Sequence, residues 1–171
     1  VVAESNGLNI CTGSLIQLYE TGDEATSWLW TGPAGFTSSE QNPVINNVTS
    51  ENQGVYIVTI SNGTCESKDT LEIYVNESLI VNIVDIEHTN CQNGNSGSAT
   101  ASVSFGTEPY SYSWNDPMAQ TTETASGLSV GNYIVTVTDA NGCTGSEQVV
   151  IESNDTEPPV ALCQDYVVYL N

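Results

Sequence analysis

Residues 54–65 read Gly-Val-Tyr-Ile-Val-Thr-Ile-Ser-Asn-Gly-Thr-Cys, and residues 131–143 read Gly-Asn-Tyr-Ile-Val-Thr-Val-Thr-Asp-Ala-Asn-Gly-Cys. Each copy has a Gly-x-Tyr start, an alternating β-branched strand, a tight turn and a final cysteine. Tyr56 stands where a tyrosine corner would hold its hydroxyl against the backbone. A repeat of this kind indicates tandem β-sandwich modules. We therefore expect an all-β chain of tandem immunoglobulin-like sandwiches joined end to end.

The repeat divides the 171 residues into modules. We expect a first sandwich at 1–77, a second at 78–153, and a linker with the first strand of a further module at 154–171. The link at 75–79 contains no glycine or proline and leads directly into the next strand, which predicts a stiff joint. The last residues, 165–171, have a strand-like pattern that stops abruptly, so we expect a section of a longer protein.

Five cysteines can staple these small modules, whose cores alone are modest. Cys11 precedes one strand and Cys65 follows a hairpin turn, so we predict a Cys11–Cys65 bond. By the same reasoning Cys143 pairs with Cys91. Cys163 is left unpaired in this chain and is expected to bond a cysteine beyond it. Disulfides imply an oxidising compartment, so we expect an exported protein.

Two groups of aromatic residues leave two interpretations open. Trp28 and Trp30 share one face of a predicted strand, and Tyr110, Tyr112 and Trp114 share one face of another. In a sandwich such residues form the core. If exposed, Trp28, Tyr110, Tyr112 and Trp114 would instead form a platform on which sugar rings stack.

The charge balance excludes several partners. The chain has 21 acidic residues and a single basic one, Lys68, for a formal net charge of −20. Such a surface repels phosphate, so we expect neither nucleic-acid binding nor attraction to an anionic membrane. The carboxylates can serve solubility and mutual repulsion of neighbouring filaments. Alternatively, some of them hold calcium.

The calcium candidates lie at the two module joints and in one turn: Glu77, Asp139, Asn141 and Asp155. No complete calcium-binding loop is present in the sequence. The run 139–142 is equally explained as favourable hairpin chemistry. We therefore expect no required cofactor, with Ca²⁺ as the one candidate.

Catalysis and membrane insertion are not expected. No carboxylate pair stands on predicted rigid elements, and His88, the single histidine, has no nucleophile motif beside it. No apolar run approaches the ~20 residues that span a bilayer. We therefore predict that the protein is not an enzyme and does not insert into a membrane.

The second module resembles a known family. The motifs that carry the resemblance are Pro109-Tyr110-Ser111-Tyr112-Ser113-Trp114, Thr121-Thr122, the run 126–133 and the run 135–143. Over about 90–151 they closely resemble the SprB repeat of gliding-motility adhesins and other surface proteins of Bacteroidetes. The first module is similar to immunoglobulin-like or PKD-like domains through 30–36 and Gly54-Val55-Tyr56. The tail resembles the first strand of a hyalin-type repeat.

The resemblance implies an extracellular segment of a large adhesin on the bacterial cell surface. It also implies export by type IX secretion, a role in gliding motility, and a parent that grips extracellular polysaccharide. We predict that this segment is a structural stalk or spacer whose partners are the neighbouring modules of its own polypeptide. The alternative is a carbohydrate-binding module of a secreted surface protein or enzyme.

Overall fold

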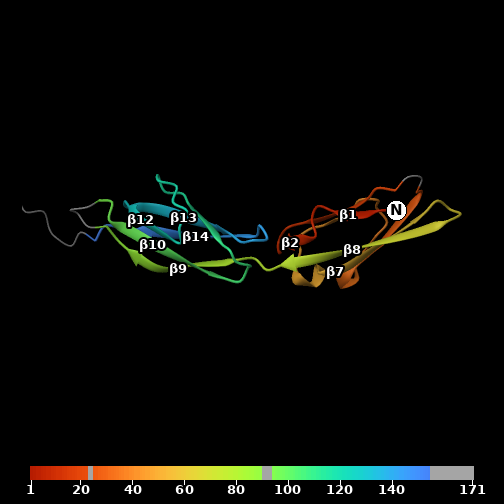
Figure 1. Cartoon of the computed structure of the whole chain (residues 1–171), viewed down its shortest axis with the longest axis horizontal. Helices are drawn as coiled ribbons and strands as arrows, with labels where there is room; N and C mark the ends of the chain where they lie inside the picture. The colour runs from red at the N-terminus through yellow and green to blue at the C-terminus, as the bar shows by residue number, and fades with distance from the viewer. Residues whose placement is uncertain (23–24, 90–93, 155–171) are drawn as a thin grey trace, which may run out of the picture.

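The computed structural model describes residues 1–22, 25–89 and 94–154 as two β-sandwiches placed end to end (Figure 1). The expected all-β, tandem immunoglobulin-like architecture is confirmed. The first sandwich consists of β1 (Ala3–Ser5), β2 (Asn9–Cys11), β3 (Ile16–Glu20), β4 (Ser27–Thr31), β5 (Thr37–Ser38), β6 (Val44–Ile45), β7 (Gly54–Ser61) and β8 (Glu66–Asn76). The second consists of β9 (Ile80–Glu87), β10 (Gly97–Ser104), β11 (Ser111–Trp114), β12 (Thr124–Leu128), β13 (Gly131–Thr138) and β14 (Thr144–Ile151). Two 3-10 turns, η1 (Pro33–Gly35) and η2 (Ser50–Asn52), lie in the loops of the first sandwich.

In the first sandwich, a sheet of order β1-β3-β6 packs on one of order β2-β8-β7-β4-β5. Its pairings are antiparallel except that β2 runs parallel to β8, with Cys11 opposite Asn76. Strand alternation sorts the side chains of β7: Tyr56 and Val58 are fully buried, whereas Val55 and Ile57, on the opposite face, are exposed. Trp30 is also fully buried. Trp30, Tyr56 and Val58 belong to the first core.

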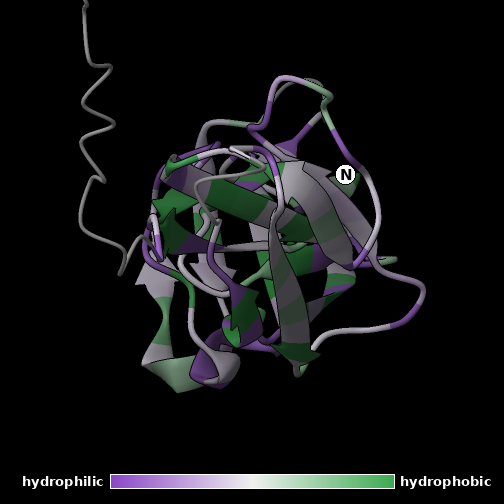
Figure 2. Ribbon diagram, turned by 90° about the vertical axis from the view of Figure 1, so that its left-hand side faces the viewer, coloured by the Kyte–Doolittle hydropathy of each residue, from purple (hydrophilic) through white to green (hydrophobic). Residues whose placement is uncertain are grey.

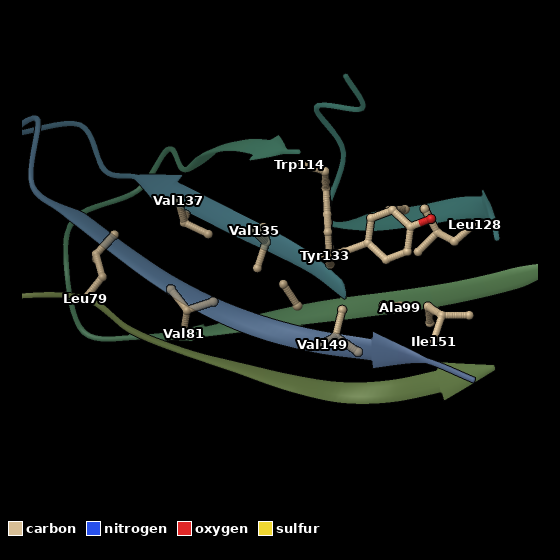
Figure 3. Packing of buried hydrophobic residues seen from close by; sticks show 12 residues of the cluster. Leu79, Val81, Ala99, Trp114, Leu128, Tyr133, Val135, Val137, Val149 and Ile151 are labelled. Carbon is tan, nitrogen blue, oxygen red and sulfur yellow. The ribbon is translucent and has the colours of Figure 1, made fainter. Parts of the chain in front are cut away.

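The second sandwich repeats the plan with sheets of order β12-β10-β9 and β11-β13-β14. Its core draws on every one of these strands (Figure 3). Figure 2 shows apolar and polar bands along the strands, as expected where one face of each sheet is buried. The buried residues are Leu79, Val81, Ala99, Ala101, Trp114, Ala125, Leu128, Tyr133, Val135, Val137, Val149 and Ile151.

A tyrosine corner is present in both sandwiches. The Tyr56 hydroxyl donates to the carbonyl of Asn52 at 2.8 Å, and the Tyr133 hydroxyl donates to the carbonyl of Ser129 at 3.1 Å. Burial raises the pKa of Tyr56, which keeps its hydroxyl protonated as a donor. The corner expected at Tyr56 is therefore confirmed. Tyr133 forms the same corner in the second sandwich, so the repeated sequence takes the same local structure in both copies.

One strand ends earlier than its sequence suggests. The sequence suggests a strand over 44–48, but β6 covers only Val44–Ile45. Asn47 adopts φ 53°, a left-handed conformation that interrupts an extended strand.

Within the described residues, no helix is long and apolar enough to cross a membrane.

Candidate functional site at the joint between the sandwiches

A disulfide joins the two sandwiches. Cys11, the last residue of β2, is bonded to Cys143 in the turn between β13 and β14, with a Cα–Cα distance of 5.5 Å. The two cysteines are 132 residues apart in sequence. In Figure 1, β2 and the blue hairpin before β14 meet where the sandwiches adjoin. The bond therefore crosses the joint.

The predicted Cys11–Cys65 and Cys91–Cys143 pairings are wrong, because Cys11 and Cys143 are bonded to each other. Cys65 is an exposed free thiol. The reason is the parallel pairing of β2 with β8: Cys11 lies opposite Asn76, at the end of an 11-residue strand that begins next to Cys65. An 11-residue strand spans roughly 33 Å, whereas bonded cysteines have Cα atoms about 4–7 Å apart. Cys91 and Cys163 lie outside the described residues.

Hydrogen bonds fix the link to the end of β2. The backbone N–H of Thr12 donates to the carbonyl of Asn76 at 2.9 Å, and the N–H of Ser78 donates to Thr12 Oγ1 at 2.9 Å. The hydroxyls of Thr12 and Ser78 lie 2.6 Å apart. Thr12, the residue next to Cys11, therefore bonds two residues of the link, Asn76 and Ser78. These hydrogen bonds limit bending of the link relative to the first sandwich.

Leu79 anchors the link in the second sandwich. Its exposed fraction is 7%, and it belongs to the second core (Figure 3). A Cβ placed on Gly145 would lie 2.8 Å from Leu79 Cβ, a separation that real Cβ atoms do not show. Gly106 also approaches the Leu79 side chain too closely to carry a Cβ. The two glycines thus leave the space that Leu79 fills.

The hairpin that carries Cys143 is held by Asp139. Asp139 Oδ1 accepts the N–H groups of Asn141 at 2.9 Å and Cys143 at 2.8 Å, and Oδ2 accepts the N–H of Thr107 at 3.0 Å. Asn141 Nδ2 donates across the joint to Asn76 Oδ1 at 3.3 Å. The turn is therefore rigid on its own side and bonded to the other sandwich.

These contacts support the hairpin interpretation of Asp139 and Asn141, and the calcium interpretation stays a prediction. Both oxygens of Asp139 accept N–H groups of the hairpin and its neighbouring loop, and Asn141 donates its amide nitrogen across the joint. Glu77 is exposed, and Asp155 lies outside the described residues. Within the described ranges, no group of three His, Cys, Asp or Glu side chains could hold a metal ion. The hairpin interpretation of 139–142 fits the contacts.

The aromatic residues proposed as a sugar platform face the cores. Trp114 is 2% exposed, so its ring cannot stack on a sugar from outside. Tyr110 and Tyr112 are partly buried and pack against the second core, as their shared face predicts. Trp28 packs against the first core and donates its indole N–H to Glu20 Oε2 at 2.9 Å. The core interpretation of both aromatic groups is the one that the burial supports.

A buried carboxylate organises the loop after β11. Asp116 is 5% exposed and accepts the N–H of Met118 at 3.0 Å and both the N–H and the side-chain amide of Gln120 at 2.8 and 3.0 Å. Burial acts to raise the pKa of Asp116, but these hydrogen bonds outweigh it and hold the pKa below its usual range. Sequence reasoning missed this residue, because a lone aspartate in a loop gives no signal of burial.

Acid should therefore weaken this loop. A carboxyl with a lowered folded pKa stabilises the fold above about pH 4, its unfolded pKa, and that contribution is lost as pH falls through the folded value. We expect Asp116→Asn to cost about 1–3 kcal/mol in urea unfolding at pH 6, since hydrogen bonds to a charged group are lost. The gap between wild type and variant should narrow as the pH falls below about 4 and the Asp116 carboxyl becomes protonated. A gap that stays constant with pH would contradict the role of the charge.

Residues 83–119 match the family model of the SprB repeat. The matched range begins seven residues before the range expected from the motifs and ends at 119, short of the expected 151, so it covers β10 and β11 but not the motifs after 119. Among curated proteins, none matches this chain.

Two solved structures share the fold at low sequence identity. The N-terminal eight Ig domains of Down Syndrome Cell Adhesion Molecule isoform 1.30.30 align with a TM-score of 0.56 and 14% identity, over 85% of this chain and 23% of that one. The C-terminal 282-residue fragment of intimin, solved with the intimin-binding domain of its translocated receptor, aligns with a TM-score of 0.53 and 14% identity, over 88% and 63%. This chain thus spans less than two thirds of either structure. At this identity the likeness concerns the fold.

Proposed function

We propose that this chain is a stiff spacer segment of an extracellular bacterial adhesin. The observation that carries the proposal is the Cys11–Cys143 disulfide across the joint. The SprB repeat and the immunoglobulin-like neighbours support a cell-surface adhesin-type module. The disulfide supports an oxidising, extracellular location.

The mechanism is mechanical. A short link alone permits bending between two domains, whose relative motion is the default unless the interface restrains it. Here the link is restrained at three points: the disulfide, the Thr12–Ser78 hydrogen bonds and buried Leu79. Because a covalent bond, hydrogen bonds and a buried side chain all hold the link, the sandwiches move as one rod. The net charge of −20 keeps neighbouring rods apart.

The SprB repeat also supports finer assignments. We propose that the parent is exported by type IX secretion and acts in gliding motility, and that its grip on polysaccharide lies in other modules. No observation favours the alternative of a carbohydrate-binding module, because the candidate stacking rings pack against the cores. No cofactor and no catalytic role is proposed for the joint.

Backbone ¹⁵N relaxation of the oxidised chain tests the proposal. We expect the amides of both sandwiches to report one shared, anisotropic rotational diffusion. In the Cys11→Ser/Cys143→Ser double variant we expect shorter correlation times that differ between the sandwiches. Cys65→Ser, which touches a free thiol, is the matched control and should leave the relaxation unchanged. Independent tumbling of the two sandwiches in the oxidised wild type would refute the stiff spacer.

A further inference from the structure

The turn that carries Cys65 is the structural counterpart of the turn that carries Cys143. In the first sandwich Ile60 pairs with Ser67, and in the second Val137 pairs with Gly145 at the same place in the hairpin. Each turn is also held by its first polar residue. Asn62 Oδ1 accepts the N–H of Cys65 at 3.0 Å, as Asp139 Oδ1 accepts the N–H of Cys143 at 2.8 Å.

The two counterparts differ in what covers them. Cys143 is 1% exposed and bonded to Cys11 of the preceding sandwich, and Leu79 of the link lies against Gly145. Cys65 is exposed and free. Beside Cys65 the surface is hollowed by about 120 Å³, lined by Ala25, Ile60, Ser61, Asn62, Cys65, Glu66 and Ser67. The hollow in the first sandwich thus lies at the position where, in the second sandwich, the link packs. Ser67 stands at the position that Gly145 holds in the second sandwich.

We propose that this end of the first sandwich receives another sandwich module of the same polypeptide, in the way that the second sandwich receives the first. A cysteine at the end of the partner's β2-like strand bonds Cys65, and the partner covers the hollow beside it. The inference rests on the proposed spacer function and extends it to a covalent ladder of modules.

A second copy of this chain does not fit as the partner. The cysteine that such a copy would supply is its own Cys11, which is already bonded to Cys143. The partner is therefore a different sandwich module, with a cysteine at the position of Cys11 that is not already in a disulfide. The bond forms when the two thiols lose two protons and two electrons to an oxidase disulfide of the export route, which is reduced to two thiols.

Disulfide mapping of the full-length parent, recovered from the cell surface and alkylated before denaturation, tests this. Cleavage after glutamate without reduction places Cys65 alone in peptide 52–66, Cys11 in 5–20, Cys143 in 124–147 and Cys91 in 88–123, because the bond between Glu108 and Pro109 is not cut. We expect peptide 52–66 to be disulfide-linked to a cysteine peptide from another sandwich of the parent. In Cys65→Ser parent, that partner cysteine should become alkylated.

The outcomes separate this inference from the proposed function. Alkylated Cys65, or a bond from Cys65 to peptide 88–123, would overturn the ladder. The same digest reports the joint itself as a bond between peptides 5–20 and 124–147. If that bond is present while Cys65 is alkylated, the spacer stands and only the ladder falls.

Discussion

Trypsin should cut this chain into two pieces that stay together until they are reduced. Lys68 is the single Lys or Arg, so cleavage yields 1–68 and 69–171. Cys11 lies in one piece and Cys143 in the other, and the disulfide between them survives denaturation in urea. We expect one species of unchanged mobility on a denaturing gel without reductant, and two species with it. Alkylation before digestion prevents exchange with the free thiol of Cys65.

Two variants make this result specific. Cys11→Ser removes the bond, so the alkylated pieces should separate without reductant. Cys65→Ser removes only a free thiol and should leave the pieces joined. With a Cys11–Cys65 bond, the pieces of the wild type would separate without reductant, because both cysteines lie in 1–68. Pieces that separate from the oxidised wild type would therefore rule out the crosslinked joint.

The sequence predicts the fold well because its signals are local. Alternation at 54–61 and 131–138 follows from the two-residue period of a strand, and Tyr56 holds a corner through a bond only four residues away. The aromatic face of Tyr110, Tyr112 and Trp114 likewise follows from alternation. Each of these features depends on neighbours in the chain, so a single sequence is sufficient to find it.

The joint could not be predicted in the same way, because its contacts are distant in sequence. The parallel pairing of β2 with β8 decides which end of the first sandwich holds Cys11, and a three-residue strand leaves little trace in the sequence. Once that end is known, Cys65 is out of reach and Cys143 is near. The absence of glycine and proline from 75–79 did indicate a short, direct link. Nothing in the sequence showed that a disulfide crosses it.

Leu79→Ala should destabilise the second sandwich by about 2–4 kcal/mol, because it removes a buried leucine and leaves a cavity that the surrounding strands only partly close. Ile80 is the matched control: it is the next residue and is 50% exposed, so Ile80→Ala should change stability by no more than about 0.5 kcal/mol. Urea unfolding followed by NMR signals of each sandwich measures both effects.

The loss in Leu79→Ala should be confined to the second sandwich, whose core Leu79 joins, while the first sandwich keeps its own midpoint. Equal losses in both sandwiches, or no loss in either, would contradict the assignment of Leu79 to the second core. If the loss is confined as expected, the link is itself a core element. In that case a bend at the joint must pull Leu79 out of the core, so the stiffness of the rod and the stability of the second sandwich share one cause.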